Sequence, residues 1–177
     1  RDLKIFEHKN DIDTKNIIQF QNYFKKNGIE KLFDKTRPNI VINCIGVIKQ
    51  TKDSDDPLNI LPINSLFPHM LYNACKDKGI RLIHFSTDCV FKGNKGDYIE
   101  VDKSDADDLY GISKKLGEIN KSDALTIRTS IIGHELKNKL GLLEWFLAQK
   151  KNVNGFKNAY FSGLPTNEIG TILNNYI

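Results

Sequence analysis

Tyr110 and Lys114 lie four residues apart in the sequence YGISK, where a helix is expected to begin. Side chains at positions i and i+4 of a helix share one face, about 5–6 Å apart. An ammonium group at that separation stabilises a phenolate, so the lysine is expected to lower the pKa of Tyr110 from its reference of about 10. The tyrosine then serves as a general acid that protonates a developing alkoxide near neutral pH. Taken alone, such a pair is also common on solvated helices, so its sequence context matters.

Thr87 supplies part of that context, because it closes an apolar segment twenty-three residues before Tyr110. A hydroxyl there can donate a hydrogen bond to a substrate carbonyl oxygen and stabilise the charge that develops on it. The alternative is a hydroxyl that only satisfies the end of a strand. The position of Thr87 before the helix of Tyr110 and Lys114 favours carbonyl chemistry. Thr87, Tyr110 and Lys114 are then the catalytic groups.

Short apolar segments alternate with longer segments of helical periodicity, and this alternation predicts how the catalytic residues are positioned. Residues 40–46 and 81–87 are apolar at both parities, as buried parallel strands are, and residues 124–130 are expected to form a third strand. Strands separated by helices of this length indicate an α/β fold, a Rossmann-like doubly wound parallel sheet. Ligands bind beyond the carboxyl ends of such strands, which directs attention to the residues that follow each one.

Helices are expected between and after these strands. Pro68 is expected to kink one of them or to mark an irregular start, and Gly79 to follow its end. Thr166 is expected to cap the last helix. The predicted helices cover residues 17–26, 61–78, 110–120 and 140–150 and a segment from 166, with a polar loop at 91–108 and a short strand at 159–162.

The composition indicates an ordinary globular protein and argues against several other classes. The 177 residues are 40% hydrophobic and 27% charged, with a formal net charge of +4. Basic and acidic residues are interleaved, so no nucleic-acid partner is expected. No apolar run approaches the roughly twenty residues of a membrane span, so no membrane association is expected. Cys44, Cys75 and Cys89 lack metal-ligand spacing, which favours free thiols in a reducing cytoplasm and no metal site.

Four segments of the chain resemble the extended short-chain dehydrogenases and, within them, the RmlD-like group of dTDP-4-dehydrorhamnose reductases. They are NCIG at residues 43–46, FSTDCVFKG at 85–93, YGISKKLGE at 110–118 and IRTSIIG at 127–133. The resemblance implies NADP or NAD as cofactor and a nucleotide sugar as substrate. It also implies that Thr87 polarises the carbonyl, Tyr110 donates the proton, and Lys114 holds both the tyrosine and the nicotinamide ribose.

The same resemblance assigns the other candidate residues. Those implied to line the cofactor are Cys44, Ile45 and Gly46, where the glycine permits close backbone approach. Asn64 matches a helix asparagine that organises a water near the lysine. Asp88 and Cys89 are implied to face the sugar, although reductases of this group usually carry tyrosine at the position of Cys89.

One part of the family pattern has no counterpart here. The family begins with a strand, a glycine-rich turn that meets the cofactor pyrophosphate at a helix N-terminus, and that helix. The first glycine of this chain, Gly28, stands alone, so the chain is expected to lack that unit, either as a fragment or by nature. Residues 1–177 are therefore expected to form a partial NAD(P)-binding domain, with a substrate-binding region starting at about residue 134.

The function that the resemblance implies is NAD(P)H-dependent reduction of a 4-keto-6-deoxy nucleotide sugar, for precursors of cell-surface polysaccharide. A nucleotide-sugar epimerase or dehydratase uses the same tyrosine and lysine, but a dehydratase would want an acid pair beside the threonine, and only Asp88 is present. A non-catalytic RmlD-like regulatory subunit, as in methionine adenosyltransferase, is a third hypothesis. The choice between NAD and NADP, the identity of the sugar, and assembly as a homodimer stay open.

Overall fold

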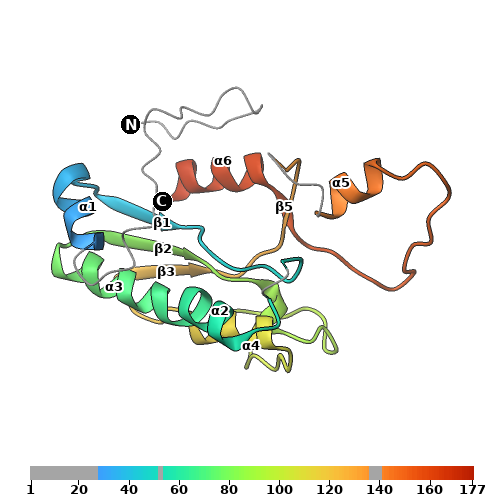
Figure 1. The fold of residues 1–177 in the computed structure, drawn as a ribbon, viewed down its shortest axis with the longest axis horizontal. Helices are drawn as coiled ribbons and strands as arrows, with labels where there is room; N and C mark the ends of the chain where they lie inside the picture. The colour runs from blue at the N-terminus through green and yellow to red at the C-terminus, as the bar shows by residue number, and fades with distance from the viewer. Residues whose placement is uncertain (1–27, 52–53, 136–140) are drawn as a thin grey trace. The chain divides into compact units, whose positions relative to one another are not determined.

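The computed structural model describes residues 28–51, 54–135 and 141–177, which divide into two compact units, residues 28–128 and 129–177 (Figure 1). The first unit contains a parallel sheet with helices packed on it, which confirms the predicted α/β class. The helix predicted at residues 17–26 lies outside the described residues.

Three parallel strands form the sheet of the first unit. They are β1 (Ile40–Asn43), β2 (Arg81–Phe85) and β3 (Ala124–Ile127). β2 lies between the other two, with Asn43 opposite His84 and Phe85 opposite Ile127, so all three carboxyl ends lie at one edge. The strands are shorter than predicted. β1, for example, ends at Asn43 because the side chain of this residue accepts a hydrogen bond from the Ile45 amide and turns the backbone.

Helical segments precede and connect these strands. They are α1 (Gly28–Thr36), α2 (Pro57–Leu61), the π-helical turn η4 (Pro62–Leu66), α3 (Phe67–Asp77), the 3-10 turn η5 (Asp88–Val90) and α4 (Leu109–Leu116). α1 was not predicted from the sequence. It forms because Ile29 and Phe33, one helical turn apart, are both buried against the core.

The helix predicted at residues 61–78 begins earlier and is interrupted. α2 starts at Pro57, after Asp56, whose carboxylate accepts a hydrogen bond from the Leu58 amide at 2.9 Å as an N-cap. The irregular part is η4, so it falls before Pro68. This proline lies in the first turn of α3, where a missing amide hydrogen costs little.

α3 ends as the sequence predicts, and α4 ends earlier. Gly79 follows α3 with a φ of +65°, the left-handed conformation that favours glycine after a helix. α4 was predicted to reach residue 120 but stops at Leu116. Gly117 caps it, because the Gly117 amide hydrogen-bonds back to the Ser113 and Lys114 carbonyls.

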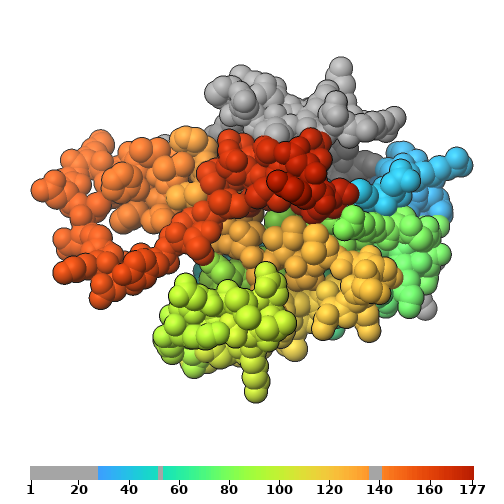
Figure 2. Space-filling model, turned by 180° about the vertical axis from the view of Figure 1, so that it is seen from behind, coloured from blue at the N-terminus to red at the C-terminus, as the bar shows by residue number. Residues whose placement is uncertain are grey.

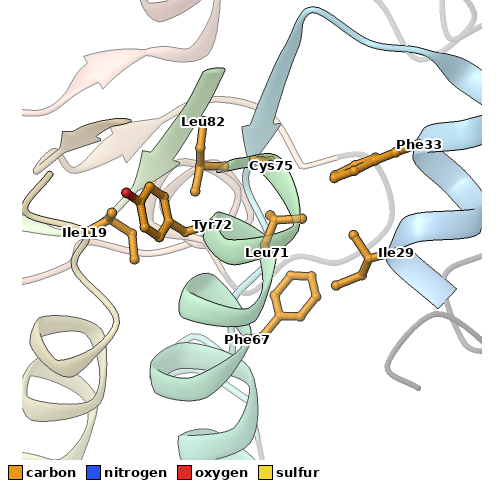
Figure 3. Close-up of a cluster of buried hydrophobic side chains, with 8 residues drawn as sticks. All are labelled: Ile29, Phe33, Phe67, Leu71, Tyr72, Cys75, Leu82 and Ile119. Atoms are coloured by element: carbon orange, nitrogen blue, oxygen red, sulfur yellow. The ribbon is translucent and has the colours of Figure 1, made fainter. Parts of the chain in front are cut away.

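The apolar core of the first unit lies where α1 and α3 meet the sheet (Figure 3). Phe67 and Leu71 of α3 face the α1 side chains, and Leu82 reaches the cluster from β2. The buried members are Ile29, Phe33, Phe67, Leu71, Tyr72, Cys75, Leu82 and Ile119. This packing holds α3 against the sheet and so fixes η4, the segment directly before α3, near the carboxyl edge.

The polar loop predicted at residues 91–108 is present and folds on itself. The rings of Phe91 and Tyr98 stack with their centroids 4.3 Å apart, and the Lys95 ammonium pairs with the Asp102 carboxylate at 2.6 Å. From the opposite side, in yellow-green in Figure 2, the segment forms a compact projection of side chains. The loop is therefore an ordered part of the first unit.

The second unit contains a short parallel strand pair and two helices. These are β4 (Ile131–Ile132), α5 (Leu142–Leu147), β5 (Leu164–Pro165) and α6 (Thr166–Tyr176). The prediction of a strand at residues 159–162 is wrong. The segment that pairs with β4 lies further along the chain, at β5. Thr166 is the first residue of α6 and not its N-cap, since Pro165 takes that place with an extended backbone. None of the described helices combines the length and apolar character needed to cross a membrane.

Candidate active site

Thr87 and Tyr110 come together beyond the carboxyl end of β2. Thr87 lies two residues after this strand and caps η5, since its hydroxyl oxygen accepts a hydrogen bond from the Cys89 amide at 3.1 Å. Tyr110 lies in the first turn of α4, and its hydroxyl is close enough to the Thr87 side chain for Thr87 to act on the pKa of the phenol. The predicted convergence of the two hydroxyls is confirmed, and this geometry lets both groups donate to one carbonyl oxygen.

Two residues that the sequence interpretation did not single out bring α4 to this position. The Asp108 carboxylate accepts a hydrogen bond from the Gly111 amide at 2.9 Å and so starts the helix. A Cβ atom at Gly111 would lie 2.5 Å from the Cys89 carbonyl oxygen, so only glycine permits this approach. The aspartate three residues before Gly111 is a readable N-cap signal. The close contact with Cys89 depends on segments that are remote in sequence.

Lys114 lies one turn along α4 from Tyr110 and is buried. Its ammonium donates a hydrogen bond to the Phe85 carbonyl oxygen at 2.7 Å, at the end of β2. Burial lowers the pKa of Lys114, and the nearby Glu118 carboxylate acts in the opposite direction. The lysine is therefore anchored under the site by the sheet backbone.

The prediction that Lys114 lowers the pKa of Tyr110 is wrong for this structure. Burial raises the pKa of Tyr110, and the influence of the Thr87 side chain only partly opposes this. The reason is the depth of the phenol in the protein, which disfavours its charged form. The tyrosine consequently stays protonated at neutral pH.

Asn64 holds the segment after β1 against α4. Its amide oxygen accepts a hydrogen bond from the Val47 amide at 2.8 Å, and its amide nitrogen donates to the Val47 carbonyl at 3.0 Å and to the Ser113 hydroxyl at 3.1 Å. The side chain is 1% exposed and lies in η4. Asn64 thus binds protein backbone directly, and the water that the resemblance implies stays a prediction.

The three residues implied to line the cofactor face different ways. A Cβ atom at Gly46 would lie 3.3 Å from Asn64 Oδ1 and 3.7 Å from Lys114 Nζ, so Gly46 lies beside the lysine. Cys44 lies within electrostatic range of the same ammonium. The Ile45 side chain packs against the apolar core.

Asp88 and Cys89, implied to face the sugar, form the turn η5 directly after Thr87. The Thr87 hydroxyl donates to Asp88 Oδ1 at 3.3 Å. Electrostatic interaction with both residues contributes to raising the pKa of Tyr110. They therefore lie next to the paired hydroxyls, with part of each residue exposed.

A carboxylate that the sequence interpretation did not use, Glu118, connects three segments behind the site. It accepts hydrogen bonds from Ser86 Oγ at 2.9 Å, from Arg128 Nε at 2.7 Å and Nη2 at 2.9 Å, and from Lys115 Nζ at 3.0 Å. Burial acts to raise the pKa of Glu118, but these donors outweigh it and hold the pKa below its usual value. Since Ser86 precedes Thr87, the network fixes the backbone that carries the catalytic hydroxyl. The pairing of Glu118 with Arg128 gives no local sequence signal.

We expect Gly117→Ala to lower the free energy of unfolding by about 1–3 kcal/mol, the usual cost of forcing an extra methyl into packed structure. A Cβ atom there would collide with the Asn64 carbonyl oxygen, whereas the φ of −85° suits alanine. Urea unfolding of the purified variant measures the change. Gly155→Ala is the matched control, because a Cβ at Gly155 meets no atom within 4 Å. Equal stability of the two variants would contradict the close packing of α4 on η4.

His84 lies in β2 and is fully buried, with Nδ1 3.0 Å from the Asn43 amide nitrogen. Burial, and after it the charge of Lys114, lower the pKa of His84 to about 4, while Glu118 acts in the opposite direction. The imidazole is therefore neutral at pH 7, even though it lies close to charged groups.

The neutral His84 is expected to make stability depend on pH. Its folded-state pKa of about 4 lies below the ordinary 6.5, so between these values the unfolded chain binds more protons than the folded one. The free energy of unfolding should then fall by about 2 kcal/mol between pH 7 and pH 5 on account of this one group. Urea unfolding at both pH values measures it. His84→Asn should remove this component and His134→Asn, at an exposed histidine, should keep it; the reverse pattern would exclude His84 as the source.

The chain is similar to known proteins along much of its length. The family model described as RmlD substrate binding domain matches residues 9–167. Among curated proteins, the dTDP-4-dehydrorhamnose reductase of Burkholderia thailandensis is 31% identical over 107 residues, which are 58% of this chain and 36% of that protein. The chain thus spans about a third of the length of the curated relatives it matches.

Two solved structures show the same fold. A hypothetical dTDP-4-dehydrorhamnose reductase from Sulfolobus tokodaii superposes with a TM-score of 0.60 at 30% identity, over 68% of this chain and 47% of that one. The dTDP-4-dehydrorhamnose reductase of Bacillus anthracis, solved in complex with NADP, gives 0.57 at 25% identity, over 64% and 43%. Because the family model matches residues 9–167, which are most of this chain, the chain belongs to the RmlD substrate binding domain family.

Proposed function

We propose that the protein carrying this chain reduces a 4-keto-6-deoxy nucleotide sugar with NADPH or NADH, in the synthesis of cell-surface polysaccharide precursors. The observation that carries the proposal is the closeness of the Thr87 and Tyr110 side chains beyond β2, with the buried Lys114 one helical turn away. Membership of the RmlD substrate binding domain family and similarity to the dTDP-4-dehydrorhamnose reductase of Burkholderia thailandensis support it.

The side chains of the site divide the work on the carbonyl oxygen. Tyr110 donates its proton as this oxygen becomes an alkoxide, and its raised pKa means that the proton is present at neutral pH. Thr87 donates a hydrogen bond to the same oxygen and stabilises the charge that develops there. Lys114, held by the Phe85 carbonyl one helical turn from Tyr110, supplies a buried positive charge on the cofactor side of the site.

The segment after β1 fits a nicotinamide cofactor. Gly46 has an exposed backbone, and a side chain there would press on Asn64 and lie close to Lys114, so the absence of one leaves room for close approach. Gly46 and Cys44 would line the ribose side, and the Lys114 ammonium would hold a ribose hydroxyl. When bound, the nicotinamide supplies the hydride.

The proposal divides the chain by role. Residues 28–128 carry the catalytic groups and part of the cofactor site. Asp88 and Cys89, next to the hydroxyl pair, would contact the sugar, and the region from about residue 134 would begin the substrate-binding part. The preference for NAD or NADP is an outcome of the experiment below.

The test is a reduction assay of the protein with a dTDP-linked 4-keto-6-deoxy sugar and either NADPH or NADH. Loss of reduced cofactor, matched mole for mole by a 4-hydroxy sugar identified by NMR, is the expected result. An isomerised sugar formed without net cofactor consumption would replace the proposal with an epimerase, and loss of water from the sugar with a dehydratase. Absence of turnover in a folded protein would favour the non-catalytic subunit.

A further inference from the structure

The buried pair Asn43 and His84 links β2 to the turn that follows β1. The backbone amide of Ile45 can only donate, so the oxygen of the Asn43 side chain must be the atom that accepts from it, at 3.1 Å. The other end of the Asn43 amide is then its NH2 group, which lies 3.0 Å from His84 Nδ1. These two contacts are enough to fix which end of the Asn43 side-chain amide is the oxygen and which is the nitrogen.

The orientation of Asn43 in turn fixes the tautomer of His84. An NH2 group facing Nδ1 requires a lone pair on that nitrogen, so the single proton of the neutral ring lies on Nε2. Among the residues that the structure describes, His84 Nε2 is the one buried side-chain nitrogen or oxygen with no hydrogen-bond partner. An apolar side chain would avoid the cost of an unpaired donor, so the useful contribution of the imidazole is the acceptor at Nδ1.

We propose that His84 is a positioning residue for the cofactor side of the site. As the neutral Nε2–H tautomer it accepts from Asn43, holds the Asn43 oxygen toward the Ile45 amide, and so fixes the turn that places Gly46 beside Lys114. Asn64 holds the next residue, Val47, through both of its backbone groups. The turn is thus fixed on one side from β2 and on the other from η4.

The groups around His84 keep it in the required state. Three titratable side chains influence the charge of the His84 ring: Lys114 in α4, Glu118 just after α4, and His69 in α3. Asn43, in β1, contacts the ring directly. Of these, the Lys114 ammonium opposes a second positive charge in the buried ring. A proton on Nδ1 would face the Asn43 NH2 group, force that amide to turn over, and release the Ile45 amide.

The first test reads the ring directly and needs no enzymatic activity. Long-range ¹H–¹⁵N NMR of the ¹⁵N-labelled protein at pH 7 should show His84 as a single neutral Nε2–H tautomer. In His84→Leu the Ile45 amide should exchange with solvent roughly tenfold faster, as expected for loss of one hydrogen bond. His84→Asn, which places an acceptor oxygen where Nδ1 lies, should restore slow exchange. A charged ring or the Nδ1–H tautomer in the wild type would overturn the proposal.

The second test rests on the proposed function. The Kd of NADPH or NADH, measured by calorimetry, should rise roughly tenfold in His84→Leu and recover in His84→Asn. The KM for the sugar should stay unchanged, and Val101→Ala, at an exposed position of the loop of residues 91–108, should behave as wild type. Unchanged cofactor affinity in a folded His84→Leu protein would overturn the positioning role. If the wild type binds neither cofactor, the proposed function fails, and the ring tautomer and Ile45 exchange alone decide whether His84 fixes the turn.

Discussion

Replacing Tyr110 with phenylalanine is expected to lower the kcat of sugar reduction by about 10²–10⁴-fold, the range for loss of a general acid. The change removes only the hydroxyl, which lies close to Thr87 and is protonated at neutral pH. The ring stays in place, so the packing of α4 against the sheet should persist. Steady-state rates with saturating cofactor and sugar measure the effect.

The control for this prediction is Tyr176→Phe, because Tyr176 is exposed at the end of α6. It should leave kcat unchanged. Urea unfolding of Tyr110→Phe should show nearly wild-type stability, which separates lost chemistry from lost structure. A Tyr110→Phe enzyme with wild-type kcat would exclude the tyrosine as proton donor and with it the central part of the proposed mechanism.

Replacing Glu118 with alanine is expected to lower the free energy of unfolding by roughly 3 kcal/mol, near the lower end for breaking a buried ion pair. The Glu118 side chain is 7% exposed, and the change leaves the Arg128 guanidinium without its two-point partner and the Ser86 hydroxyl without its acceptor. The lower end applies because the Arg128 side chain, at 21% exposure, can recover some contact with water. Urea unfolding at pH 7 measures the loss.

Lys115→Ala is the matched control, since Lys115 binds the same carboxylate from an exposed position. It should cost less than about 1 kcal/mol, as surface ion pairs do. Combining Glu118→Ala with Arg128→Ala should cost less than the sum of the two single changes, because each removes the same interaction. Strict additivity would show that the pair does not contribute as a unit.

The Arg128 side chain also explains why the loss should spread beyond α4. Its Nη1 donates to the Glu100 carbonyl at 3.2 Å, and its guanidinium lies 5.2 Å from the centre of the Phe91 ring. Phe91 stacks on Tyr98 within the loop of residues 91–108. Removing Glu118 therefore loosens one anchor of that loop as well as the backbone before Thr87.

The candidate hydroxyl pair could be predicted because its signals are local or follow from sheet topology. Tyr110 and Lys114 are spaced to share one helix face, Thr87 follows an apolar strand, and parallel strands end at one edge. These rules need only periodicity and chain order, and they were enough to predict the α/β class and the meeting of Thr87 with Tyr110. The roles of these residues and of Lys114 remain proposals.

The sequence could not predict the electrostatics of the site. Spacing placed Lys114 within reach of Tyr110, and from spacing alone the phenol should become more acidic. In the folded chain the phenol is partly buried and its pKa rises, while the ammonium is bound by Phe85. The direction of such a shift depends on the balance of desolvation and charge, and desolvation is set by depth in the tertiary structure.

The sequence by itself thus determined the alternation of strands and helices and the residues that follow each strand, because these depend on near neighbours in the chain. Only the tertiary structure decided which polar groups meet: Glu118 with Arg128, His84 with Asn43, and Gly117 with the Asn64 carbonyl. Each of these contacts joins different segments of the fold. Spacing carries no record of them, because burial and packing bring them together only when the sheet and helices assemble.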